Sequence, residues 1–222
     1  MNLNSGFFNK PESQYFYLKS ITMIALSEFE YLTPEAYLEF ESQSPIKHEY
    51  INGQAYAMAG TTDIHNTIAL NLATILRSQL RGTDYRVYFA DLKLRIEQRN
   101  CFYYPDLLIT CDRRDRETAT YKRFPKLIIE VLSDSTEARD RGDKFNDYQT
   151  LETLETYILV NTKTPRVEVF ERQQTGGWHF RTYTSTEESF TLKTLNLTIA
   201  WADLYEDINL ELEVNRLPNR ED

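Results

Sequence analysis

One glutamate interrupts an otherwise apolar run of six residues, Leu127 to Leu132. An apolar run of this length is typical of a β-strand that is covered on both faces. Glu130 stands inside the run, and burying an isolated carboxylate is costly unless a cation, a hydrogen-bond network or an open strand end lies beside it. The run therefore predicts a buried strand, over about Lys126–Leu132, that brings one acidic group to a polar site.

A second acidic residue is embedded in a similar way. Asp106 follows Pro105 and precedes apolar residues, in a run that predicts a strand over Phe102–Thr110. If the two strands are neighbours, Asp106 and Glu130 can bind one divalent ion, and hard carboxylate oxygens suit Mg²⁺ or Mn²⁺. The alternative is that each carboxylate forms a structural salt bridge with a nearby arginine or lysine. The spacing alone fits both interpretations.

The first part of the chain predicts a helix, a hairpin and a second helix. Thr33 is a suitable N-cap before Pro34, and this helix is expected to end near Ser42. Asn52-Gly53 separates two short β-prone runs, which is a strong signal for a two-residue hairpin. The second helix is predicted over about 63–80, because apolar residues recur there every three or four positions: Ile64, Ile68, Leu72, Ile75, Leu76 and Leu80.

The rest of the chain alternates strands with helices. From Tyr85 to Ile96 the apolar positions change from odd to even at Ala90-Asp91, and this phase change predicts a bulge or bend in the strand. A helix is predicted over 136–151, and Gly176-Gly177 predicts a turn. The remaining predicted elements are strands at Tyr157–Asn161, Arg166–Glu171, Trp178–Thr184 and Phe190–Leu195, the last pairing with the one before it, and a short helix at Trp201–Tyr205. This order predicts a mixed α/β fold with one central core sheet, itself mixed, that is flanked by helices.

The length of 222 residues fits one domain with appended ends. We expect a poorly ordered extension over 1–25, where the first residues show no clear period, a single domain over 26–210 and a tail over 211–222. No stretch approaches the ~20 apolar residues of a membrane span, and none forms a signal-peptide core. Cys101 and Cys111 lack metal-type spacing and suggest reduced thiols, so a cytoplasmic protein is expected.

The net charge of −9 excludes a strongly basic nucleic-acid binder, but the charge is unevenly distributed. Residues 1–49 carry −4 and residues 201–222 carry −5, so the stretch between them is neutral, with 20 acids and 20 bases. This leaves room for local basic clusters, of which the clearest consists of Arg113, Arg114, Arg116, Lys122, Arg123 and Lys126. We expect modest non-specific affinity for DNA.

Several ordered motifs resemble the PD-(D/E)XK nuclease superfamily. Pro105-Asp106 precedes Ile129-Glu130-Val131-Leu132-Ser133, and Glu130 follows Asp106 by 24 positions. The fuller pattern is similar to the Uma-type restriction endonuclease family. Its further motifs are Glu49-Tyr50-Ile51-Asn52-Gly53, then Asp140-Arg141-Gly142-Asp143-Lys144 leading into Tyr148, and last Tyr157-Ile158-Leu159-Val160. The likeness covers about residues 33–172 and implies a restriction-endonuclease-like core.

The resemblance implies metal-assisted hydrolysis of a phosphodiester, with DNA as the substrate and Mg²⁺ or Mn²⁺ as the cofactor. Asp106, Glu130 and the main-chain carbonyl of Val131 would hold the ion. Glu49 matches the helix-associated glutamate of the superfamily and would take a second ion or an outer-shell water; the alternative is a surface glutamate at the hairpin edge. By analogy with nucleases that cut duplexes, the protein would be a homodimer, with the C-terminal strands and the Trp201–Tyr205 helix as candidate interface elements.

One departure from the superfamily pattern bears on activity. The pattern has a lysine two residues after the glutamate, where this chain has Leu132. Such a lysine leans toward the attacked phosphate and lowers the pKa of the nucleophilic water. Lys144, on the following helix, is the first candidate to replace it, and Lys93, which alternates with Leu92 and Leu94, is the second. The alternative for Lys144 is an ordinary solvated helix face.

The histidines and the missing lysine leave other interpretations open. His65 begins the second predicted helix, where a substrate-side role and a purely structural role both fit. His48 and His179 have no partners at ligand spacing, so zinc is not expected.

A rival function is a catalytically inactive member of the family that acts in binding or assembly. A hydrolase of another phosphorylated substrate would share the same metal chemistry.

Overall fold

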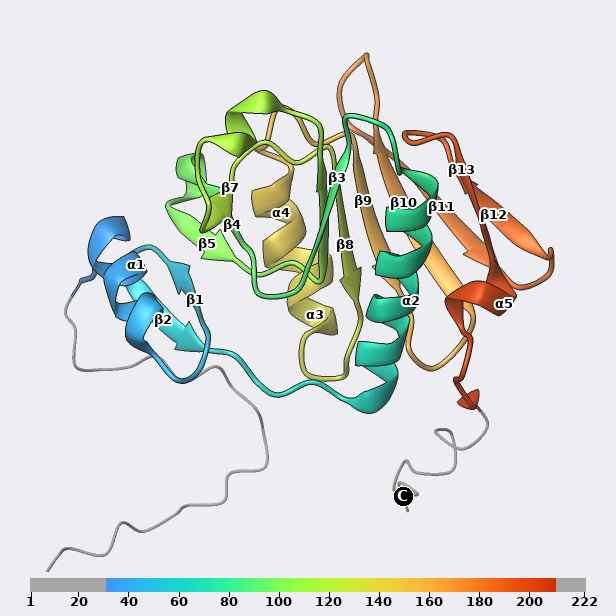
Figure 1. Ribbon diagram of the computed structural model, residues 1–222, viewed down its shortest axis with the longest axis horizontal. Coiled ribbons are helices and arrows are strands. Elements are labelled where there is room, and N and C mark those ends of the chain that lie inside the picture. The colour runs from blue at the N-terminus through green and yellow to red at the C-terminus, as the bar shows by residue number, and fades with distance from the viewer. Residues whose placement is uncertain (1–30, 211–222) are drawn as a thin grey trace, which may run out of the picture.

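The strand that carries Glu130, β8 (Leu127–Val131), lies inside a six-stranded sheet in a computed structural model of the protein (Figure 1). The structure describes residues 31–210. The predicted extension 1–25, the first residues of the predicted domain and the tail 211–222 lie outside the described residues. The strand order in this sheet is β11 (Trp178–Thr184), β10 (Arg166–Arg172), β9 (Thr156–Val160), β8, β6 (Leu107–Thr110) and β3 (Arg86–Phe89).

This sheet is mixed, as the sequence predicts. β8 runs parallel to β9 and antiparallel to β6, and the other neighbouring pairs are antiparallel. A parallel pair needs a crossover connection, which the helical segment between β8 and β9 provides. All five residues of β8 are buried, as expected for a strand that is covered on both faces. The central mixed sheet with flanking helices is therefore confirmed.

A second sheet of five strands lies beside the first (Figure 1). Its strand order is β2 (Gln54–Ala57), β1 (His48–Ile51), β5 (Cys101–Tyr103), β4 (Lys93–Ile96) and β7 (Tyr121–Lys122). The predicted hairpin is present as β1 and β2, with Asn52 and Gly53 at φ values of 47° and 92°. The expectation of one core sheet is wrong, because the chain passes back and forth between two sheets.

Two breaks in the predicted strands explain the second sheet. At Ala90 and Asp91 the backbone takes φ values of 40° and 57°, so the strand predicted over 85–96 becomes β3 in one sheet and β4 in the other. The strand predicted over Phe102–Thr110 is likewise split into β5 and β6. Pro105 has no N–H to donate to a sheet ladder, which accounts for the second break. Asp106 therefore lies at a strand end rather than in mid-strand.

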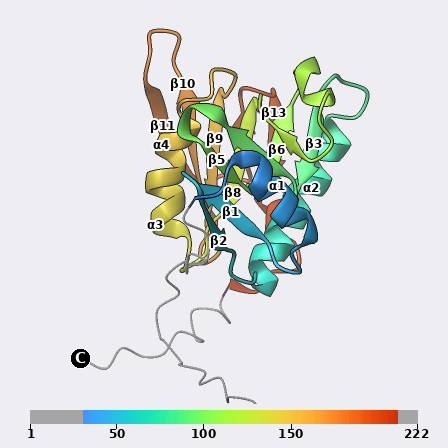
Figure 2. The same cartoon turned by 90° about the vertical axis from the view of Figure 1, so that its left-hand side faces the viewer.

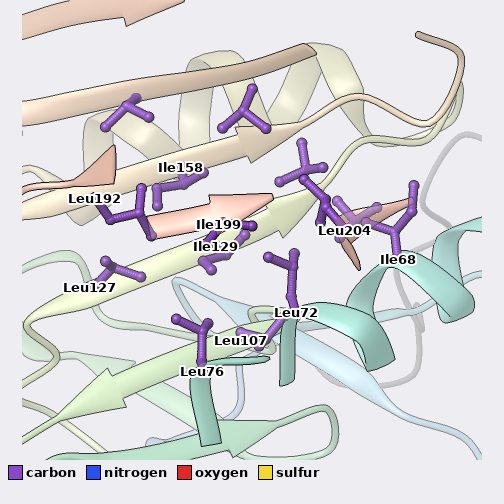
Figure 3. Close-up of a cluster of buried hydrophobic side chains, with 14 of the residues drawn as sticks. Ile68, Leu72, Leu76, Leu107, Leu127, Ile129, Ile158, Leu192, Ile199 and Leu204 are labelled. Carbon is purple, nitrogen blue, oxygen red and sulfur yellow. The ribbon is translucent and has the colours of Figure 1, made fainter. Parts of the chain in front are cut away.

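Helix α2 (Asp63–Gln79) covers one face of the six-stranded sheet (Figure 3). Ile68, Leu72 and Leu76, from its predicted apolar stripe, are buried in one cluster with Leu107 and Ile129 of the sheet. Burying each such side chain contributes roughly 1.5–3 kcal/mol. The stripe therefore holds the helix on the sheet and fixes where its first turn lies.

The opposite face of the sheet is covered by a helical segment in three parts (Figure 2). These are α3 (Glu137–Arg139), η3 (Asp140–Lys144) and α4 (Phe145–Tyr148). η3 is a π-helical turn, which inserts an extra residue into the helix. Tyr148 is buried in one cluster with Ile128 and Leu132. The helix predicted over 136–151 thus ends at Tyr148, and Leu151 is buried beyond its end.

Helix α1 (Pro34–Gln43) covers the second sheet. It begins after Thr33, whose hydroxyl caps the first turn, as predicted. Tyr37 packs against Tyr50 and Phe102, with ring centroids 5.0 and 5.1 Å away. The helix is thereby fixed over the strand that carries Glu49.

The last described residues form a hairpin of β12 (Ser189–Leu192) and β13 (Leu197–Ala200), followed by helix α5 (Trp201–Leu204). The strand predicted over Phe190–Leu195 was expected to pair with β11; it pairs instead with β13, after a turn at Asn196 with a φ of 51°. Trp201 and Leu204 are buried in the α2 cluster, so α5 directs its apolar side chains inward. Two short turns, η1 (Glu97–Arg99) and η2 (Arg113–Arg116), connect strands. Within residues 31–210 no helix has the length and hydropathy of a membrane span.

Candidate active site

The two embedded acids lie side by side where β6 and β8 pair. The antiparallel register sets Leu107 opposite Ile129, which places Asp106, one residue before β6, next to Glu130. The amide of Asp106 donates to Glu130 Oε2 at 3.3 Å, and the amide of Val131 donates to Asp106 Oδ2 at 2.7 Å. Strand pairing and two hydrogen bonds therefore hold the two carboxylates in one place.

The environments of these two carboxylates differ. The Glu130 side chain is 3% exposed, whereas that of Asp106 is 22% exposed. Burial raises the pKa of Glu130 to about 8, with Asp140 and Asp106 adding to the rise and Lys144 opposing it. Burial and the neighbouring carboxylates thus disfavour the ionised form of Glu130, and a cation bound at this site would favour it.

Lys144 reaches the buried end of Glu130. Its ammonium lies 3.1 Å from Glu130 Oε1, 3.1 Å from Asp140 Oδ1 and 3.4 Å from Glu49 Oε1. Burial alone would lower the pKa of Lys144, but the charges of Glu130, Glu49 and Asp140 outweigh burial and raise it. The π-helical turn η3 ends at Lys144, and such turns are frequent at functional sites. The lysine is therefore a fixed positive charge in a cage of three carboxylates.

Glu49 is buried and faces this cage. Its side chain is 3% exposed, so it is no surface glutamate at the hairpin edge. One oxygen faces Lys144 and the other pairs with the guanidinium of Arg139. The first hairpin and the helical segment after β8 are thus joined across the site.

Lys93, the second candidate, lies elsewhere. Its ammonium is 5.3 Å from the centroid of the Tyr104 ring, and burial lowers its pKa. Leu132, at the position where the superfamily has its lysine, is 3% exposed and belongs to the cluster around Tyr148. The structure therefore brings Lys144, and not Lys93, to Glu130.

A cavity of about 220 Å³ opens over these groups. Residues 57–62, between β2 and α2, form one wall, and His65 from the first turn of α2 lies beside them. His65 Nε2 is 3.2 Å from Asp106 Oδ2, and its Nδ1 is 2.9 Å from Thr61 Oγ1. Burial alone would lower the pKa of His65, but the hydrogen bond and charge of Asp106 outweigh burial and raise it. His65 thus belongs to the site rather than to the core.

The family of the chain follows from its sequence as a whole. The Uma2 family model, described as "Putative restriction endonuclease", matches residues 34–202. The chain belongs to the Uma2 family. Two uncharacterized proteins of Synechocystis sp. are similar to it. One, slr1290, is 36% identical over 177 residues, covering 80% of this chain and 93% of the relative. The other, sll1609, is 29% identical over 159 residues, covering 70% and 89%.

The fold of this Uma2 chain is similar to the fold of a solved structure. That structure is "a putative nuclease belonging to DUF820" from Anabaena variabilis, with a TM-score of 0.64 and 16% sequence identity. The match covers 78% of this chain and 97% of the other. At this identity the likeness concerns the fold alone. The restriction-endonuclease-like core expected from the sequence is therefore confirmed.

Three residues of the candidate site escaped the sequence-based prediction. Tyr148 donates to Glu130 Oε1 at 2.7 Å, Asp140 contacts Lys144, and Arg139 pairs with Glu49. Asp140, Lys144 and Tyr148 recur every four residues, and such residues share one face of a helix. That spacing could have identified Asp140, whereas Tyr148 reads as an ordinary core residue. No sequence signal singles out Arg139.

The donor set fits a hard divalent cation. Four carboxylates and two fixed cations line the cavity: Asp106, Glu130, Glu49, Asp140, Lys144 and Arg139. Within the described chain, the buried oxygens Glu49 Oε1 and Asp140 Oδ1 accept no hydrogen bond of good geometry, and each is ion-paired with Lys144, at 3.4 and 3.1 Å. In residues 31–210 no three His, Cys, Asp or Glu side chains are grouped so as to hold an ion by themselves. Mg²⁺ usually takes one or two carboxylates, with water and substrate phosphate completing its shell, so two side-chain ligands suffice.

Proposed function

We propose that this protein is a divalent-metal-dependent nuclease that hydrolyses phosphodiester bonds in DNA. The observation that carries the proposal is the pairing of Asp106 with Glu130 through the amides of residues 106 and 131. Membership of the Uma2 family and the nuclease-like fold agree with this function. An excess of buried carboxylates, at the bottom of a cavity open to a ligand, supports the metal.

The residues that would hold the ion are Asp106, Glu130 and the carbonyl of Val131. Glu49 would accept a water of the ion's outer shell, or take part in holding a second ion. When bound, Mg²⁺ or Mn²⁺ lowers the pKa of a coordinated water and neutralises charge that develops on the phosphate. Glu130 must be ionised to act as a ligand, and Lys144 favours that state by lying 3.1 Å from its Oε1.

The remaining groups would orient the substrate. Lys144 stays protonated, so we assign it electrostatic stabilisation of the phosphate and not proton abstraction. His65 lies at the cavity wall and touches Asp106, where its imidazole can orient the carboxylate or donate to a phosphate oxygen. Both groups act by holding charge in place while water attacks phosphorus and the P–O bond to the leaving group breaks.

A cleavage assay tests the proposal. Purified protein should cleave plasmid and single-stranded DNA with Mg²⁺ or Mn²⁺, and chelation with EDTA should stop the reaction. Asp106→Ala and Glu130→Ala should each abolish cleavage. The control variant Lys193→Ala, at an exposed residue outside the candidate site, should cleave as the wild type does. Cleavage that survives both active-site substitutions would falsify the assignment. Release of phosphate from small phosphoesters without cleavage of DNA would identify another phosphorylated substrate.

A second candidate is a catalytically inactive family member that acts in binding or assembly. It is favoured by Leu132 in the expected lysine position and by the three carboxylates that already surround Lys144. Calorimetry separates the two. A catalytically competent site should release or absorb heat on binding Mn²⁺, and this binding heat should be lost in Asp106→Asn. An inactive module should give no such binding heat.

We also propose that the protein acts as a homodimer, as nucleases that cut both strands of a duplex commonly do. Helix α5 buries Trp201 and Leu204 in the core of the same chain, so few of its apolar side chains are left for a partner. The exposed strand β11 is therefore the better candidate interface among the C-terminal elements. Light scattering on the purified protein tests this directly: a mass of one chain contradicts it.

A further inference from the structure

The basic loop that the sequence singles out is largely neutralised in the fold. Arg114 pairs with Asp112 at 2.6 Å, and Arg123 lies 3.3 Å from Glu97. Lys126 pairs with Glu155 at 2.6 Å. Lys122 is buried, and its ammonium donates to the carbonyls of residues 115 and 118. Four of the six basic side chains of this cluster therefore have partners within the fold, whereas Arg113 forms no ion pair within residues 31–210 and Arg116 lies 3.9 Å from Asp84.

Within the described residues, three exposed arginines without an ion pair lie close together outside this cluster. Arg77 is in the last turn of α2, Arg81 follows that helix, and Arg86 begins β3. Within residues 31–210 no acidic side chain lies within ion-pair distance of any of the three, although the chain carries a net charge of −9. Unpaired arginines on an acidic protein point to an anionic partner.

These arginines line two adjoining hollows, which share Arg77 and Val87. One, of about 400 Å³, is also lined by Arg86, by Arg116 and by the exposed carboxylate of Asp84, which lies 3.9 Å from Arg116. The other, of about 470 Å³, is also lined by Arg81 and the half-exposed ring of Phe89. We call Arg77, Arg81 and Arg86 the arginine surface. Guanidinium groups beside an apolar ring suit phosphates that are attached to sugars and bases better than free inorganic anions.

The arginine surface is connected to the candidate active site by strand β3. The amide of Ala90, which follows β3, donates to the carbonyl of Asp106 at 3.0 Å. From Ala90 the chain runs away from that point to Arg86, a span of four residues and about 14 Å at 3.4 Å per residue. β3 packs beside α2, whose first turn carries His65 of the same site (Figure 1). Successive phosphates of one DNA strand advance about 3.4 Å along the helix axis, so this span corresponds to about four nucleotides.

We infer that the arginine surface binds the sugar-phosphate backbone of a nucleic acid, about four nucleotides from the bond at Asp106. This inference rests on the proposed function, because it assigns the rest of the substrate's path. An acidic polypeptide would be attracted to the same arginines. The apolar ring of Phe89 beside the arginines favours the nucleic acid.

The test is fluorescence anisotropy with labelled single- and double-stranded oligonucleotides, in EDTA, so that binding is measured without cleavage. The variant Arg77→Gln/Arg86→Gln is compared with a charge-matched control, Arg114→Gln/Lys193→Gln, whose residues are exposed in η2 and after β12. The arginine variant should bind about tenfold more weakly, and its salt slope between about 50 and 200 mM should fall by about two. The control should match the wild type.

Two results overturn the inference. One is equal affinity and equal salt slope in the arginine variant and the control. The other is tight binding of poly-glutamate with no binding of oligonucleotides, which would assign the surface to an acidic protein. The proposed function fails separately: if no DNA is cleaved with Mg²⁺ or Mn²⁺ while the arginine-dependent binding persists, the nuclease assignment is lost and the binding surface stands.

Discussion

The ammonium of Lys144 lies 3.1 Å from Oε1 of Glu130, although the two residues are 14 positions apart in the chain. A lysine two residues after the glutamate would come from the same strand. Here the positive charge comes from the π-helical turn that follows, and Asp140 and Glu49 hold it in place. The relationship makes Lys144 the group on which activity should depend.

Removing this charge should slow cleavage much more than it weakens substrate binding. Lys144→Gln should lower kcat by about 10²–10³-fold, as loss of a charge-stabilising donor does. Lys93→Gln is the matched control and should leave kcat within about twofold. Because Lys144 is buried, circular dichroism must first show that the variant is folded. Equal losses in both variants would contradict the role of Lys144.

Returning the lysine to the superfamily position should not help this protein. Leu132 is 3% exposed among apolar side chains, so Leu132→Lys should lower the free energy of unfolding by several kcal/mol, on the order of 3. Leu132→Met keeps volume and polarity and should cost less than about 1.5 kcal/mol. Urea denaturation measures both. A Leu132→Lys protein as stable as the wild type would show that this position opens into the cavity.

A buried carboxylate behind the site should position Asp106. Glu41 Oε1 accepts from the Tyr104 hydroxyl at 2.7 Å and from the amide of His48 at 2.9 Å. These two hydrogen bonds tie α1 to Tyr104, two positions before Asp106, and to His48, one position before Glu49. Tyr104→Phe should therefore lower Mn²⁺ affinity several-fold, besides costing about 1–1.5 kcal/mol of stability.

Tyr37→Phe is the matched control for Tyr104→Phe. It removes a buried hydroxyl of the same cluster, which donates to the carbonyl of His48, and it keeps the Tyr104 hydroxyl that donates to Glu41. It should cost similar stability, about 1 kcal/mol, without changing Mn²⁺ affinity. If calorimetry finds the same Mn²⁺ affinity in both variants, the link is structural only.

Acid stability should depend on Glu168 of β10. Burial alone would raise its pKa, but hydrogen bonds from Arg141 and Arg166 outweigh burial and hold the pKa below its ordinary value of 4.5. A depressed pKa in the folded state means that the stabilisation is present above pH 4.5 and is lost as the pH falls through the folded-state pKa. Glu168→Gln should be less stable than the wild type by about 1–3 kcal/mol at pH 7, and the gap should close as the pH falls below about 4. If the difference in the free energy of unfolding between the two proteins stayed constant with pH, the charge of Glu168 would play no part in stability.

Much of the fold could be predicted because local chemistry decides it. Asn52-Gly53 fixes a hairpin, the Thr33-Pro34 pair begins a helix, and the apolar stripe of α2 selects the face that packs on the sheet. The division into two sheets could not be predicted. The phase change at Ala90 marks a bend, but the sheet that each half joins depends on pairings with β5 and β6, which are contacts distant in sequence.

The candidate site shows the same limit. Glu130 could be found because a charge within an apolar strand demands a partner, and Asp106 because it shares that pattern. Asp140 could have been found from its four-residue spacing to Lys144, but Arg139 could not be ranked above the other charges of a dense polar helix, since the π-helical turn and the packing of Tyr148 decide which of them face inward. The basic loop was misleading for a related reason: some of its acidic partners, Glu97 and Glu155, come from distant segments.

The central claim is that Asp106 and Glu130 converge on one divalent ion. Anomalous diffraction from crystals soaked in Mn²⁺ tests it most directly. The account predicts a peak about 2.2 Å from both carboxylates and from the carbonyl of Val131, absent in crystals of Asp106→Asn soaked in the same way. A wild-type crystal with no peak between the two carboxylates, or a peak that persists unchanged in Asp106→Asn, would contradict it.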